Sequence, residues 1–122
     1  MKAGDVTLPD EILRGIRHFN AGEYFEAHEA WEDHWGHGGP QERAATLGLI
    51  KAAVALHHLQ AGNGPGFAWQ AQEAIRNLRG NHEVWPALRL DALAEALDGL
   101  AAEVRFHGRA QGGLPRIPEK GE

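Results

Sequence analysis

Cysteine is absent from the 122 residues of the chain. This absence excludes a disulfide scaffold, a cysteine-based zinc site and a thiol nucleophile, and it favours a cytoplasmic location. No apolar run is long enough for a transmembrane helix, and Met1 to Pro9 lack the apolar run of a signal peptide. We therefore expect a soluble cytoplasmic protein without a membrane partner.

Basic residues are in the minority, with 12 Lys and Arg against 17 Asp and Glu and a net charge of -5. They are scattered along the chain and form no basic stripe, so a nucleic-acid partner is not expected. β-Branched residues are also few, whereas alanine and leucine are plentiful, which favours helix over strand. The length suits one domain. The sequence predicts an all-α protein.

Proline, glycine and the apolar spacing divide the chain into helices. The predicted helices run from about Pro9 to Asn20, Tyr24 to Trp35, Pro40 to about Ala61, about Phe67 to Leu78, and from Asp91 onward. The short turn at Gly22 predicts that the first two form an αα-hairpin. We expect a compact antiparallel bundle of about five helices over residues 1–107, with residues 108–122 as an extended or disordered tail.

The stretch from Tyr24 to Trp35 concentrates histidine, carboxylates and aromatic residues. Helical geometry places His28 and Glu32 within its aromatic face, so both are expected to point into the bundle. In the apolar helix that follows, Lys51 and His58 share one stripe and could meet them. The predicted cluster, a buried polar network or a ligand site, consists of His28, Glu32, Lys51, His58, Tyr24, Trp31 and Trp35.

Three interpretations of this cluster stay open. It could be a hydrogen-bonded network that fixes helix packing. It could instead be a pocket for a small or peptidic ligand, with Lys51 recognising an anion and the aromatic residues as walls. The third interpretation is a site for one divalent metal ion, with His28 and Glu32 as ligands from one helix and His58 from the next.

The metal interpretation makes the chain a small metal-dependent hydrolase, with Glu29 as the general base. Against it, Glu32 stands where the zincin motif H-E-x-x-H has its second histidine. Whether the chain is an enzyme stays open.

Other candidate residues have simpler roles. His34 and His37 are expected to be solvent-exposed groups that complement the end of their helix, and His57 a surface residue. Trp69 and Trp85 are assigned to the core or to a contact in a homodimer, for which the apolar third helix leaves room.

Two blocks of sequence resemble a known family. The first block is Phe19-Asn20-Ala21-Gly22-Glu23-Tyr24-Phe25-Glu26-Ala27-His28-Glu29, continued by Glu32 and Trp35, and the second runs from Leu49 to Asn63. Both resemble the domain of unknown function 309 family of small bacterial and archaeal helical proteins. The resemblance extends to about Phe106 and implies a compact bundle of about five helices. It implies no reaction, and it carries over His28, Glu29, Glu32 and His58 as candidates without assigned roles.

Overall fold

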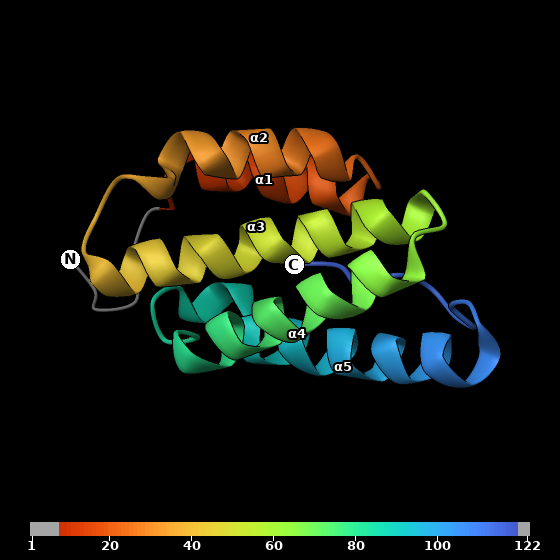
Figure 1. Ribbon diagram of the computed structural model, residues 1–122. Coiled ribbons are helices and arrows are strands. Elements are labelled where there is room, and N and C mark those ends of the chain that lie inside the picture. Colours follow the sequence, from red (N-terminus) through yellow and green to blue (C-terminus); the bar gives the residue numbers. More distant parts are fainter. Residues whose placement is uncertain (1–7, 120–122) are drawn as a thin grey trace.

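The computed structural model describes residues 8–119, which form five α-helices and one 3-10 turn (Figure 1). The elements are α1 (Asp10–Asn20), α2 (Tyr24–Trp35), α3 (Pro40–Gln60), α4 (Gly64–Gly80), the turn η1 (Pro86–Leu88) and α5 (Leu90–His107). The predictions made for Met1–Thr7 and for the last three residues of the tail lie outside the described residues.

Successive helices pack side by side, and α3 is the central one, with α1 and α2 on one side and α4 and α5 on the other (Figure 1). Residues 8–119 contain no strand. The predicted all-α bundle that starts with an αα-hairpin is therefore confirmed. Within the same residues, no helix combines the length and the apolarity that crossing a membrane would need.

Two turns of the same form connect α1 to α2 and α3 to α4. Gly22 and Gly62 both adopt a φ of +79°, a left-handed conformation that glycine tolerates without strain. After the second turn, α4 begins at Gly64, three residues before the predicted start. The reason is local: the Asn63 side chain accepts a hydrogen bond from the Gly66 amide, and Pro65 fits a first helical turn.

The core between α1 and α2 is aromatic. Trp31 is fully buried, and its indole Nε1 donates a hydrogen bond to the carbonyl oxygen of Ile12 at 3.1 Å. Gly15 of α1 leaves the space for this ring, because a Cβ at that position would collide with the indole. Phe19 packs edge-on against Tyr24, with ring centroids 5.2 Å apart. These contacts fix the hairpin and hence the direction in which each face of α2 points.

After α5, the tail turns back along the bundle toward α1. Ile117 is fully buried in the core. Its amide donates to Asn20 Oδ1 at 2.8 Å, and its carbonyl accepts from Asn20 Nδ2 at 2.7 Å. Residues 108–119 contain no helix or strand, and they contribute a side chain to the core.

Candidate functional site

The aromatic residues predicted for the site lie in different environments. Tyr24 and Trp31 belong to the core, and burial raises the pKa of the Tyr24 hydroxyl above its ordinary value of 10.0. Trp35 is 46% exposed. The aromatic residues of α2 therefore do not form the walls of a single pocket.

His28 and Glu32 contact each other at the surface. His28 Nε2 lies 3.2 Å from Glu32 Oε2, and the Glu32 side chain is 56% exposed. The expectation that Glu32 points into the bundle is wrong, because other residues fill the interface with α1 and α3. The buried residues of α2 are Tyr24, Ala27, Ala30, Trp31 and His34.

Lys51 and His58 of α3 have partners other than the His28–Glu32 pair. Lys51 Nζ lies 3.2 Å from Glu73 Oε1 of α4, and this hydrogen bond is the main cause that lowers the pKa of Glu73. His58 Nδ1 lies 3.2 Å from Asn63 Nδ2 in the turn after α3. The predicted polar residues thus form three separate pairs.

Because these residues lie in separate pairs, the predicted metal ligands are not brought together. Within residues 8–119, no three His, Asp or Glu side chains lie close enough together to hold an ion. His28, Glu32 and His58 therefore do not assemble into the expected three-ligand site. Glu29 is exposed on the outer side of α2, and within residues 8–119 it belongs to no cluster of three potential metal ligands.

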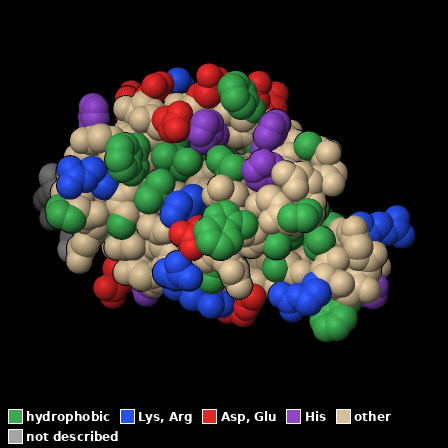
Figure 2. Space-filling view, in the orientation of Figure 1, with side chains coloured by type: hydrophobic (Ala, Val, Ile, Leu, Met, Phe, Trp, Pro, Cys, Tyr) green, Lys and Arg blue, Asp and Glu red, His purple; other side chains and the backbone are tan. Residues whose placement is uncertain are grey.

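The three pairs nevertheless share one side of the molecule. The α2–α3–α4 face is defined here by Phe25, His28 and Glu32 of α2, Leu47, Lys51, Val54, His57 and His58 of α3, and Trp69 and Glu73 of α4. Phe25 is 51% exposed, and its ring centroid lies 6.1 Å from that of His28 and 6.3 Å from that of His57. Trp69 is 65% exposed, so of its two expected roles, in the core or in a homodimer contact, the structure excludes the first. Figure 2 shows histidine and hydrophobic side chains gathered on this side.

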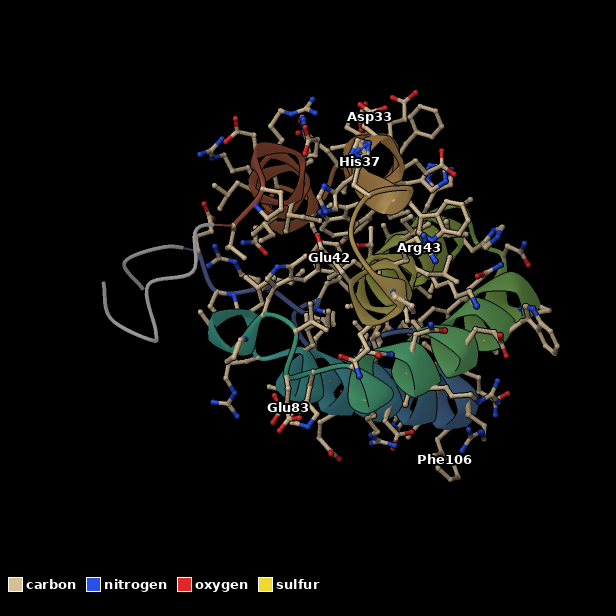
Figure 3. The ribbon with its side chains drawn as sticks, turned by 90° about the vertical axis from the view of Figure 1, so that its left-hand side faces the viewer. Asp33, His37, Glu42, Arg43, Glu83 and Phe106 are labelled. Atoms are coloured by element: carbon tan, nitrogen blue, oxygen red, sulfur yellow. The ribbon has the colours of Figure 1, made fainter. Side chains whose placement is uncertain are left out.

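The structure places His34 in a site that the sequence did not predict. Its side chain is only 8% exposed, which contradicts the expected solvent-exposed cap. Nε2 lies 2.7 Å from Glu42 Oε2 of α3, and Nδ1 lies 3.3 Å from Glu11 Oε1 of α1. We call these three residues the His34 node. Figure 3 shows Glu42 and the neighbouring His37 at the end of the molecule where α2 leads into α3.

The His34 node joins three helices through one imidazole. Both ring nitrogens face carboxylate oxygens, so the ring contacts α1 and α3 at the same time. The pKa of Glu11 is lowered, mainly by a backbone hydrogen bond and also by His34. Trp85 lies against the same imidazole, with centroids 6.2 Å apart, and its burial assigns it to the core, the first of its two expected roles. The His34 node is therefore suited to hold α1, α2 and α3 in a fixed arrangement.

One signal in the sequence could have identified this position. Tyr24, Ala27, Trp31 and His34 are spaced by three, four and three residues, as on the buried stripe of a helix. Ala27 interrupts the aromatic pattern of this stripe, so the stripe was not recognised.

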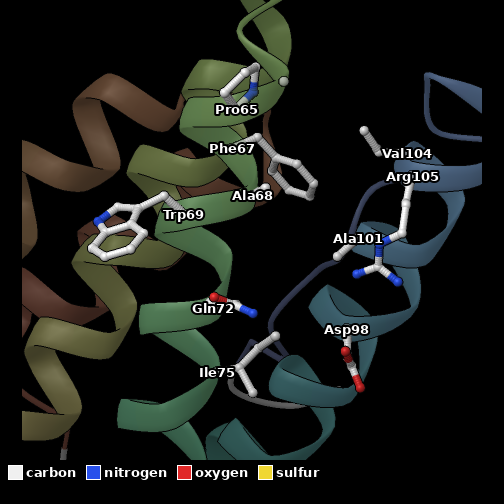
Figure 4. A pocket seen from close by; sticks show the side chains of 11 residues that line it. Pro65, Phe67, Ala68, Trp69, Gln72, Ile75, Asp98, Ala101, Val104 and Arg105 are labelled. Atoms are coloured by element: carbon white, nitrogen blue, oxygen red, sulfur yellow. The ribbon is translucent and has the colours of Figure 1, made fainter.

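A cleft of about 510 Å³ lies between α4 and α5 (Figure 4). None of the predicted site residues lines it. Its lining residues are Gly64, Pro65, Phe67, Ala68, Trp69, Gln72, Ile75, Asp98, Ala101, Val104 and Arg105. Figure 4 shows the Trp69 indole pointing away from α5, toward the other side of α4.

Comparison with known proteins gives two findings. A protein of Aquifex aeolicus (strain VF5), described as an uncharacterized protein, is 33% identical over 70 residues, which cover 56% of this chain. The chain spans about a fifth of the length of that relative, with 21% covered. The family model of the domain of unknown function 309 (DUF309) matches residues 12–70, from α1 into α4. The predicted resemblance to the DUF309 family is therefore confirmed over residues 12–70.

Proposed function

We propose that this domain is a binding module that recognises an amphipathic helix of a partner protein through its α2–α3–α4 face. The observation that carries the proposal is the exposure of two large aromatic side chains, Phe25 at 51% and Trp69 at 65%, on helices that flank α3. Aromatic residues supply much of the binding energy at protein interfaces, because they bury a large area at a small entropic cost.

The surface of α3 between these two aromatic residues suits a helical ligand. Leu47, Lys51, Val54 and His58 follow one another by four, three and four residues, so they form one stripe along α3. All four are only half-buried by α2 and α4. A helix lying along this stripe would cover the apolar Leu47 and Val54, and it would contact the aromatic residues on both sides.

The charge of α2 defines the chemistry of the partner. Glu29 and Glu32 are exposed on α2 at the outer border of this face, and within residues 8–119 Glu29 has no ion-pair partner. A partner helix with lysine or arginine along one edge would complement these carboxylates. The proposed ligand is therefore a helix with one apolar face and one basic edge.

The other interpretations of the predicted cluster have less support. A small-ligand pocket or a metal-dependent hydrolase needs His28, Glu32, Lys51 and His58 to converge on one point, whereas these residues have separate partners. Interaction with a partner needs only that they share a surface. The Aquifex relative supports a modular role, because the matched segment is 21% of that longer protein.

A designed peptide tests the proposal. We expect a fluorescein-labelled amphipathic helix of leucine and lysine to bind the full chain, as measured by fluorescence anisotropy, and a leucine and glutamate helix of the same pattern to bind at least tenfold more weakly. Phe25→Ala and Trp69→Ala should each weaken binding of the lysine peptide about tenfold or more, as truncation of an aromatic anchor does.

Phe106→Ala is the matched control, because Phe106 is 77% exposed but lies on α5, away from this face (Figure 3). Equal loss of binding in Phe106→Ala and Trp69→Ala would contradict the proposal, since it would indicate unspecific adsorption to aromatic residues. A chain that forms dimers in analytical ultracentrifugation, and that Trp69→Ala converts to monomers, would also overturn it by showing that a second copy occupies the face.

A further inference from the structure

We propose that the cleft between α4 and α5 binds a small molecule with an apolar body and one anionic head group, of the medium-chain monocarboxylate class. The cleft lies between α4 and α5, and Trp69 is the residue of its lining that also belongs to the α2–α3–α4 face (Figure 4). The inference concerns a different ligand and does not rest on the proposed partner helix.

The size and lining of the cleft suit a small apolar molecule. Its volume of about 510 Å³ is in the range of small-molecule sites in proteins. Phe67 is fully buried and provides an aromatic base, and Ala68 and Ile75 of α4 face Ala101 and Val104 of α5. Small side chains on both helices keep the space between them open.

The charges at the cleft favour an anion. Arg105 lines the cleft, and within residues 8–119 its guanidinium has no carboxylate partner. Asp98, the acidic residue of the lining, contacts Arg79, whose Nη2 lies 3.7 Å from Asp98 Oδ2. The cationic group is thus the one available to a ligand. A guanidinium binds a carboxylate with two parallel hydrogen bonds, which fixes the orientation of the head group.

The geometry of the two helices fixes which end holds the head group. Gly64 and Pro65, in the first turn of α4, line the same cleft as Arg105, and the amino end of a helix carries a partial positive charge. From Arg105 the α5 wall continues through Ala101 to Asp98, a rise of about 10 Å at 1.5 Å per residue. An extended eight-carbon chain matches that length.

Isothermal titration calorimetry of the full chain with octanoate tests this inference, with 1-octanol and octylamine as ligands of equal chain length and different head groups. We expect saturable binding of octanoate, at least tenfold tighter than that of either control. Arg105→Gln should weaken octanoate binding at least tenfold and leave 1-octanol binding unchanged. Arg109→Gln, which removes an exposed arginine outside the cleft, should change neither.

Further variants separate this site from the face proposed above. Ala68→Phe, at an exposed position of the lining, should fill the cleft and abolish the binding of both octanoate and 1-octanol. Phe25→Ala should leave octanoate binding unchanged, although it weakens binding of the lysine peptide. Circular dichroism spectra would confirm that each variant is folded.

Three results would overturn the inference. Absence of saturable octanoate binding would exclude the site. Equal affinity for octanoate in the original chain and in Arg105→Gln would exclude the anionic head group. Tighter binding of octylamine than of octanoate would show that Asp98, not Arg105, recognises the ligand.

Discussion

The two ends of α2 use the same residue types in opposite ways. Near its start, His28 contacts one exposed carboxylate, and near its end, His34 lies between two carboxylates with 8% of its side chain exposed. Trp31 is fully buried, whereas Trp35, one turn later, is 46% exposed. The difference shows that the neighbouring helices, and not the type of residue, decide whether a polar or aromatic side chain of α2 stabilises the fold or is available for binding.

The largest difference in the free energy of unfolding is expected between variants of the two tryptophans of α2, Trp31 and Trp35. Trp31→Ala should lower the free energy of unfolding by about 3 to 5 kcal/mol, because it leaves a large cavity against α1. Trp35→Ala should change it by less than about 0.5 kcal/mol. Urea unfolding followed by circular dichroism measures both values, and equal losses would contradict the assignment of Trp31 alone to the core.

An intermediate effect is expected at the two histidines. His34→Ala should lower the free energy of unfolding by about 2 kcal/mol, since it leaves Glu11 and Glu42 without their shared partner. This value allows for the partial exposure of both carboxylates, 38% and 31%. His28→Ala should cost less than about 0.5 kcal/mol, because its partner Glu32 is mostly solvated.

A double-mutant cycle sharpens the contrast between the histidines. We expect a coupling energy of about 1 kcal/mol or more between His34→Ala and Glu42→Ala, and a value within about 0.5 kcal/mol of zero between His28→Ala and Glu32→Ala. A cycle in which the two pairs couple equally would remove the distinction between the His34 node and the surface pair.

The smallest effect is expected in the dependence of stability on acidic pH. The pKa of Glu73 is lowered by Lys51 and Arg76, so the folded state favours the ionised carboxylate. The stabilisation is fully present above the ordinary pKa of 4.5, and it should be lost as the pH falls below that value and through the lowered pKa. Glu73→Gln should therefore flatten the dependence of the melting temperature on pH below about 4.5. An unchanged profile would show that the Lys51–Glu73 pair contributes nothing to acid stability.

The sequence predicted the helices better than it predicted their faces. Prolines, glycines and caps are local signals, so α2 begins and ends at the predicted residues, and α3 ends within one residue of its predicted end. The direction of burial depends on the neighbours. The aromatic residues of α2 suggested a face that includes Trp35, whereas Ala27 and Ala30 in fact pack in the interface.

Lys51 illustrates a second limit of prediction from the sequence, which concerns the choice of partner helix. Lys51 shares a stripe of α3 with Val54 and His58. However, α3 has neighbours on both sides, and the periodicity of one helix cannot show whether a lysine pairs with α2 or α4. The cleft between α4 and α5 could not be predicted at all, because a cavity depends on how closely two helices approach, which their separate sequences do not specify.

The contact between Asn20 and Ile117 has a consequence for how the chain is made. These residues are 97 positions apart, and Ile117 is a fully buried part of the core next to the first hairpin. During synthesis, α1 through α5 leave the ribosome before this side chain does. The site that receives Ile117 therefore stays uncovered until translation has passed the whole helical segment.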